Sequence, residues 1–204
     1  LLHAYGHDGK LLALSVLVAD GRCRKPRVAI DAGGGAVVSY EDRSLTETGG
    51  QGVRCLWLAT DGTLRQALNV GPTDNGGLAL DVTGTRHLTW RRRRDRTIYH
   101  TAISPTGRMS DAVAISPPAS DFSDLTADLA DGSLHVVAVV AAGKWLYYLE
   151  RTVDGRWLEP REFTFSEVVN LGEADNVNPD IAVDGSGRRF IVFTGENHWP
   201  FYFI

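Results

Sequence analysis

The sequence has one methionine, two cysteines and no apolar run that approaches the roughly 20 residues of a membrane-spanning helix. It also lacks the apolar spacing of an amphipathic helix, and glycine or proline interrupts the chain at short intervals. No basic segment followed by an apolar one opens the chain. These absences predict a protein with no membrane span and little helix.

Cysteine content and charge exclude further classes of protein. Cys23 and Cys55 match neither a metal-binding spacing nor a small disulfide scaffold, so we favour two unbridged thiols. The formal charge of -4 argues against a nucleic-acid partner. The run from Arg91 to Arg94 is the exception, and we interpret it as a charged strand edge that discourages aggregation.

Glycine and aromatic residues are abundant, a balance that favours strands and tight turns. Three phrases align with one another, VAIDAGGGAVVSY, LALDVTGTRHLTW and IAVDGSGRRFIVF, and LTADLADGSLHVVAV has the same outline. Each phrase reads as a short strand, an aspartate, a turn with glycine and a second strand, which predicts a hairpin. The repeated aspartates are Asp31, Asp81, Asp128 and Asp184.

A second turn phrase recurs between the first ones, and its glycines are Gly9, Gly62, Gly107 and Gly155. Two interleaved hairpins per period give four antiparallel strands every 45 to 56 residues, the pattern of a β-propeller blade. The sequence therefore predicts an all-β fold, a β-propeller of about four repeats.

We expect residues 1–204 to form a single propeller domain. Its repeat units span approximately residues 26–74, 75–120, 121–175, and 176–204 together with 1–25. The last unit is split between the chain ends, which suits either a closed four-bladed ring or a part of a larger propeller. Because the first residue is Leu1 and both ends interrupt a strand, we favour a processed or partial chain.

The phrase TVDGRW, from Thr152 to Trp157, resembles the Asp-box of sialidase-like propellers with BNR repeats, although it is shorter. The resemblance implies that the Asp154 carboxylate accepts turn N–H groups and that Trp157 packs between strands. Sialidases also carry an N-terminal arginine motif, which this sequence lacks. The resemblance therefore extends to the repeat class and does not imply sialidase activity.

The loops between the second and third strands, and those between blades, share one face, where we look for a site. Aromatic rings there suit the C–H surface of a sugar, and carboxylates, amides and arginines suit its hydroxyls. The candidate ligand-binding residues are Trp90, Arg91, Asn178, Asn197 and Trp199. The candidate catalytic residues are Glu41, Asp42, Asp180, Glu196 and His198, because glycoside hydrolysis needs a pair of carboxylates and a proton carrier.

No cofactor is predicted, and Ca²⁺ is an open alternative. The oxygen-bearing residues Asp175, Asn176, Asn178 and Asp180 suit that ion but lack the order of an EF-hand. Aspartate or asparagine before a strand also commonly caps a turn.

Three functional hypotheses follow. The first is an extracellular or periplasmic propeller that binds or processes carbohydrate. The second is a scaffold without catalysis whose loop face binds another protein. The third is a truncated glycosidase, suggested by the phrase GKWLYY.

Overall fold

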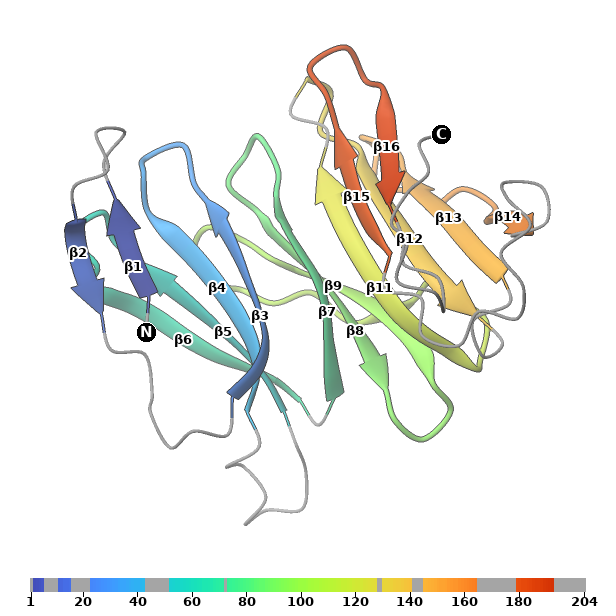
Figure 1. The fold of residues 1–204 in the computed structure, drawn as a ribbon, viewed down its shortest axis with the longest axis horizontal. Coiled ribbons are helices and arrows are strands. Elements are labelled where there is room, and N and C mark those ends of the chain that lie inside the picture. Colours follow the sequence, from blue (N-terminus) through green and yellow to red (C-terminus); the bar gives the residue numbers. More distant parts are fainter. Residues whose placement is uncertain are drawn as a thin grey trace. The chain divides into compact units, whose positions relative to one another are not determined.

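The computed structural model describes residues 2–5, 11–15, 23–42, 52–71, 73–127, 130–140, 145–164 and 179–192. Every regular element among them is a β-strand, so the all-β prediction is confirmed. A search of the same residues finds no helix long and apolar enough to cross a membrane. The chain divides into two compact units, Leu1–Asn75 and Gly76–Ile204 (Figure 1).

The first unit contains a two-stranded and a four-stranded antiparallel sheet. The two-stranded sheet pairs β1 (Leu2–Tyr5) with β2 (Leu11–Ser15). The four-stranded sheet follows the chain in the order β3 (Cys23–Ile30), β4 (Ala36–Asp42), β5 (Gly52–Leu58) and β6 (Leu64–Gly71).

The described part of the second unit also consists of two-stranded and four-stranded sheets. Its first strand, β7, crosses the boundary between the units. One sheet contains β7 (Thr73–Leu80), β8 (Arg86–Arg92), β9 (Thr97–Ile103) and β10 (Val113–Ala114). The next contains β11 (Ser120–Ala127), β12 (Leu134–Val140), β13 (Trp145–Arg151) and β14 (Arg161–Thr164). The last pairs β15 (Asp180–Val183) with β16 (Arg189–Val192).

Three of the described sheets have four strands each, the number predicted for one repeat unit. Each is an antiparallel meander, in which every strand pairs with its neighbours in the chain. The predicted strand content of the repeat is thereby confirmed. Ring closure, blade number and a single domain over residues 1–204 stay predictions.

One turn geometry recurs at six hairpins among the residues that the structure describes. In each, the N–H of the first turn residue donates to the carbonyl four residues later, and a glycine three residues later donates back. These glycines have φ between 77 and 90°, which L-residues with a side chain rarely adopt. The six turns begin at Asp31, Ala59, Asp81, Ser104, Thr152 and Asp184.

The predicted aspartates cap three of these turns. One oxygen of Asp31 accepts the N–H groups of Gly33 and Gly35 at 2.9 and 2.8 Å, and its second oxygen accepts the Trp57 indole N–H at 3.2 Å. Asp81 and Asp184 each accept two N–H groups of their own turns in the same way. Such a cap does not require the carboxylate to be buried.

Asp128 lies outside the described residues, and a different aspartate caps its turn. Asp131 accepts the N–H of Ser133 at 2.7 Å. The register pairs Ala127 with Leu134, so this connection is one residue longer than the one between Ile30 and Ala36. Asp131 accepts the Ser133 N–H as Asp61 accepts that of Thr63.

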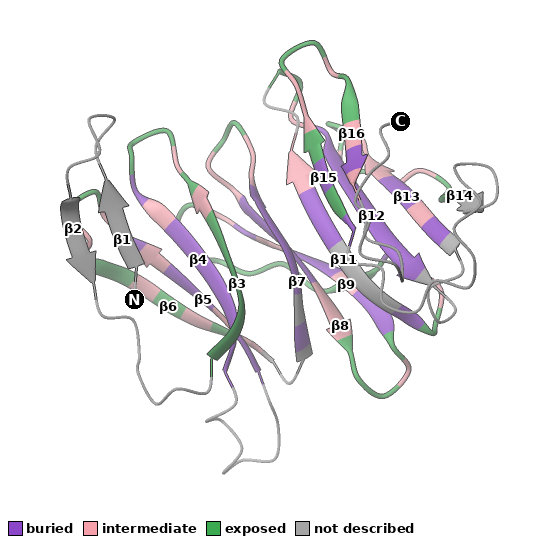
Figure 2. Ribbon diagram, viewed as in Figure 1, coloured by how far each residue is buried: buried purple, intermediate pink, exposed green. Residues whose placement is uncertain are grey.

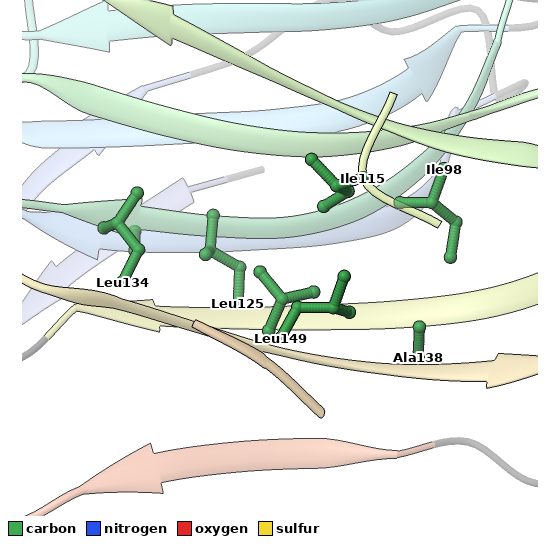
Figure 3. Packing of buried hydrophobic residues seen from close by; sticks show 8 residues of the cluster. Ile98, Ile115, Leu125, Leu134, Ala138 and Leu149 are labelled. Carbon is green, nitrogen blue, oxygen red and sulfur yellow. The ribbon is translucent and has the colours of Figure 1, made fainter. Parts of the chain in front are cut away.

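The core of the second unit lies between two sheets that pack face to face (Figures 2 and 3). Side chains of β12 alternate, so Leu134, Val136 and Ala138 face the β7–β10 sheet. Trp157 packs against this cluster and meets His100 edge-on at 5.2 Å. The structural role expected for Trp157 is confirmed.

The two cysteines form no disulfide, as expected. Cys55 is buried opposite Ser39, whereas Cys23 is exposed opposite Asp42. Ser39 and Asp42 are three residues apart on one strand, so the two thiols face opposite sides of the sheet.

We predict that Gly84→Ala destabilises the second unit by roughly 1–2 kcal/mol, because a Cβ opposes the left-handed backbone. Gly185→Ala is the matched control, since its turn position has ordinary φ and nothing within 4 Å of an added Cβ. That variant should be neutral or slightly more stable. Urea unfolding followed by tryptophan fluorescence measures both, and equal effects would contradict the role of the turn.

Candidate functional site

Each four-stranded sheet has two different ends. The capped turns gather at one end; in the first sheet, a Cβ added to Gly34 would lie 3.0 Å from Thr60 of the other turn. The end of β4 at Asp42, the start of β5 at Gly52 and the β8–β9 connection lie at the opposite end because the strands are antiparallel. We call the latter the loop end, and it corresponds to the face where the sequence predicted a site.

Charged residues are buried at the loop end of the first sheet. Tyr40, Glu41 and Asp42 close β4 with exposed fractions of 4, 2 and 0%. The Lys25 ammonium lies 2.9 Å from the Glu41 carboxylate. Because adjacent side chains alternate along a strand, Glu41 and Asp42 point to opposite faces and do not converge on each other.

Arg54 joins this cluster from β5, directly opposite Tyr40. Its Nε atom lies 3.3 Å from Asp42 Oδ2 and donates to Asn69 Oδ1 at 3.2 Å. Burial raises the pKa of the Tyr40 hydroxyl, and Arg54 partly opposes that effect. The Arg54 side chain is 28% exposed, so it is a positioned cation that solvent still reaches.

Sequence reasoning missed Arg54. The available signal was an arginine inside the otherwise apolar strand GVRCLWL, where a charge needs a partner. Naming that partner requires the strand register, which the sequence alone does not provide.

Trp90 and Arg91 lie at the end of β8 in the second unit. The Trp90 indole N–H donates to Thr101 Oγ1 at 2.9 Å, and its ring stacks on Tyr99 with centroids 4.7 Å apart. Trp90 and Arg91 are both half-buried. Their ligand-binding roles stay predictions, and the structure adds that the Trp90 N–H already has a partner.

Asp180 begins β15 and is exposed. Its Oδ1 accepts the N–H of Ile181 at 3.0 Å, and Asp124 Oδ2 accepts the same N–H at 3.2 Å. Among the described residues no group of three or more His, Cys, Asp or Glu side chains is placed to hold a metal. The remaining candidates lie outside the described residues: Asp175, Asn176, Asn178, Glu196, Asn197, His198 and Trp199.

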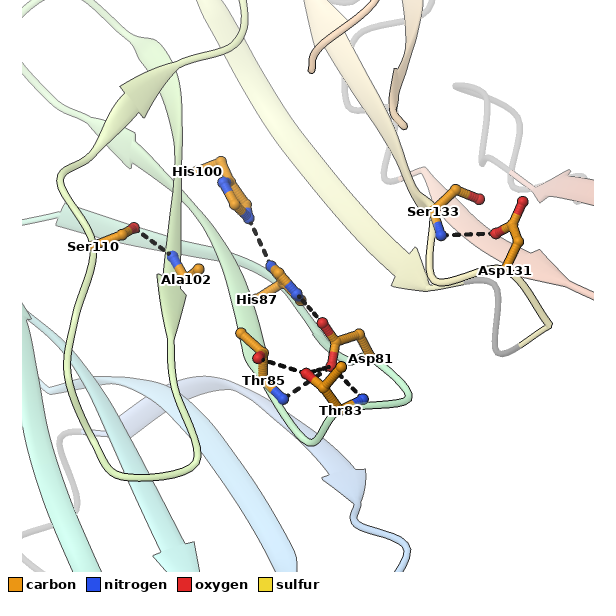
Figure 4. Close-up of polar contacts among 9 residues, drawn as sticks. All are labelled: Asp81, Thr83, Thr85, His87, His100, Ala102, Ser110, Asp131 and Ser133. Atoms are coloured by element: carbon orange, nitrogen blue, oxygen red, sulfur yellow. Dashed lines mark hydrogen bonds and ion pairs between the residues drawn. The ribbon is translucent and has the colours of Figure 1, made fainter. Parts of the chain in front are cut away.

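A chain of buried polar groups runs through the second unit (Figure 4). His87 Nδ1 lies 3.0 Å from His100 Nε2, and His87 Nε2 lies 3.1 Å from Asp81 Oδ2. The two imidazoles are 2 and 4% exposed. The pair is enclosed by the protein, so it serves the fold rather than a substrate.

A related chain occupies the next sheet. His135, at the position in β12 that His87 has in β8, contacts Ser133 Oγ at 3.0 Å and Tyr148 OH at 2.7 Å. The Tyr148 hydroxyl donates to Glu150 at 2.9 Å. Burial, followed by the Glu150 carboxylate, raises the pKa of Tyr148. Both chains satisfy polar groups inside the sheets.

We predict that the buried pair makes the second unit acid-sensitive. Burial, then the His87 and Arg151 charges, lowers the pKa of His100 to about 3; burial lowers that of His87, and Asp81 partly opposes this. Both rings stay neutral in the folded state, whereas unfolded histidines gain protons below pH 6.5. Their stabilisation is complete above that pH and is lost as pH falls, by about 2 kcal/mol at pH 5 for His100.

Urea unfolding between pH 7.5 and pH 5 measures this loss. His100→Gln should flatten the dependence in that window, because the carboxylates titrate at lower pH. Equal pH dependence in the variant and the wild-type protein would show that His100 is not responsible.

Comparison with known proteins shows a fold likeness only. No family model matches the chain, and no curated protein matches it. Among solved structures, it is similar to a Hadza microbial sialidase, Hz136, with a TM-score of 0.51 and 14% identity, over 86% of this chain and 45% of that one. The chain thus spans less than half the length of that sialidase, and its fold is similar to the sialidase fold.

Proposed function

We propose that this chain is part of a carbohydrate-binding β-propeller and that the loop end of its first sheet contacts the sugar. The observation that carries the proposal is Arg54, a partly exposed guanidinium held by Asp42 and Asn69. The likeness to a sialidase fold supports carbohydrate as the ligand class.

The contacts of Arg54 suit recognition of sugar oxygens. A guanidinium has five donors in a planar fork; the Nε atom of Arg54 meets Asp42 and Asn69, and its side chain also contacts the Tyr40 hydroxyl. The remaining N–H groups can donate in pairs to hydroxyl or carboxylate oxygens. Asp42 is fully buried and acts by orienting Arg54. Binding, rather than hydrolysis, is the activity we propose, since Glu41 and Asp42 point to opposite faces.

Arg54→Lys tests the proposal because it keeps the charge beside Asp42 but removes the planar fork. We expect sugar affinity to fall roughly tenfold, which corresponds to about 1.4 kcal/mol. Arg65→Lys is the matched control, since Arg65 lies in the same sheet over the Trp57 ring, beside the capped turns. Isothermal titration calorimetry against sugars selected on a glycan array measures both.

Two results would contradict the proposal: no sugar on the array binds the wild-type protein, or Arg54→Lys binds as the wild-type protein does. If no sugar binds and a stoichiometric protein is captured from native lysate, the scaffold hypothesis is favoured. A hydrolysis assay on the bound sugars tests the glycosidase hypothesis, including the predicted roles of Asp180, Glu196 and His198.

A further inference from the structure

The connection between β8 and β9 concentrates positive charge. Residues 91–96 read RRRRDR, five arginines and one aspartate in a chain with a formal charge of -4. Arg92, Arg93, Arg94 and Arg96 are exposed. We call residues 91–96 the arginine hairpin.

Protection of a sheet edge does not account for these arginines. Edge charges act where a strand has unpaired backbone groups. In this sheet the order is β10-β9-β8-β7, so β8 and β9 are the two central strands. The arginine hairpin therefore projects from the end of the sheet, where no strand could add, and the interpretation of the run as an edge is wrong.

The arginine hairpin is anchored rather than loose. The Arg96 N–H donates to the Arg92 carbonyl at 2.8 Å, and Asp95 Oδ1 accepts the Thr97 N–H at 3.2 Å. The Ala119 and Ser120 N–H groups donate to the carbonyls of Asp95 and Arg96 at 3.0 and 2.8 Å. These backbone contacts tie the connection to the start of β11, so its backbone needs little ordering before the arginines bind.

Aromatic rings lie beside the arginine hairpin. Trp90 and Tyr99 stack at 4.7 Å, and the Arg92 guanidinium lies 4.8 Å from the Tyr99 ring centroid. Arg92 also pairs with Asp95, whose pKa is lowered by that contact. Half-buried aromatic surface next to fixed cations offers both a stacking face and charge-assisted donors.

We propose that the arginine hairpin binds an anionic polysaccharide, a chain of sugars with repeated carboxylate or sulfate groups. The repeated charge of such a ligand matches a row of arginines, and its rings match the surface of Trp90 and Tyr99. The choice of carbohydrate rests on the proposed function. The arginine hairpin belongs to a different sheet from Arg54, so different variants test the two proposals.

The arginines could also attract a nucleic acid, since phosphates and aromatic stacking suit the same groups. The rest of the chain is acidic, which limits either polyanion to contact with the arginine hairpin alone, so the choice of a polysaccharide over a nucleic acid rests on the proposed function. An oligonucleotide is therefore the comparison ligand in the test.

The experiment measures binding of the full chain to heparin, to polygalacturonate and to a single-stranded oligonucleotide by biolayer interferometry at about 50 and 300 mM salt. We expect one of the polysaccharides to bind more tightly than the oligonucleotide, and salt to weaken binding. The double variant Arg93→Ala/Arg94→Ala should bind about tenfold more weakly and with less salt dependence. Arg108→Ala/Arg156→Ala, exposed arginines of two capped turns, is the matched control and should bind as the wild-type protein does.

Heparin and polygalacturonate distinguish sulfate from carboxylate recognition. The proposal is overturned if neither polysaccharide binds at low salt, if the oligonucleotide binds as tightly, or if both double variants behave alike. Arg54→Lys separates the two proposals: unchanged polysaccharide binding by that variant supports a distinct hairpin site. If Arg54→Lys loses sugar binding while Arg93→Ala/Arg94→Ala binds polysaccharide as the wild-type protein does, the proposed function is supported and the hairpin proposal is contradicted.

Discussion

A carboxylate that accepts two backbone N–H groups of a turn, together with a glycine at positive φ, holds three of the described hairpins. Asp31, Asp81 and Asp184 each use one oxygen for this purpose. Fixing the turn fixes strand register, because the residues on either side must pair. Register in turn decides which side chains enter the core, so the sheets depend on these few polar contacts.

The second oxygen of each capping carboxylate links the turn to a side chain that differs between copies. It meets the Trp57 indole in the first sheet, the His87 imidazole in the second and the Arg188 guanidinium in the last. Only the middle partner extends inward, to His100, and so brings a titratable chain into the core. The repeat therefore conserves the backbone function of the aspartate while the neighbouring side chain changes its electrostatic character.

The hairpins were predictable from the sequence because aspartate and glycine stand at constant offsets between short apolar strands. The turn after β11 differs from this pattern, since its connection is one residue longer and Asp131 accepts the Ser133 N–H. Arg54 escaped for a different reason: its partners Asp42 and Asn69 lie on neighbouring strands, and only pairing brings them together. Turns can thus be predicted from local sequence patterns. A site whose residues lie on several strands can be predicted only when the strand register is known.

The polar side chains at the two ends of a sheet make different contacts. At the turn end, side-chain oxygens are occupied by backbone N–H groups, which leaves little capacity for a ligand. At the loop end, the charged groups that the structure describes are held by side chains or by backbone contacts to a neighbouring strand. Arg54 is oriented by Asp42, and the arginine hairpin by carbonyl contacts to Ala119 and Ser120. In both places the protein holds positive charge near the end of a sheet, and it is there that we propose recognition.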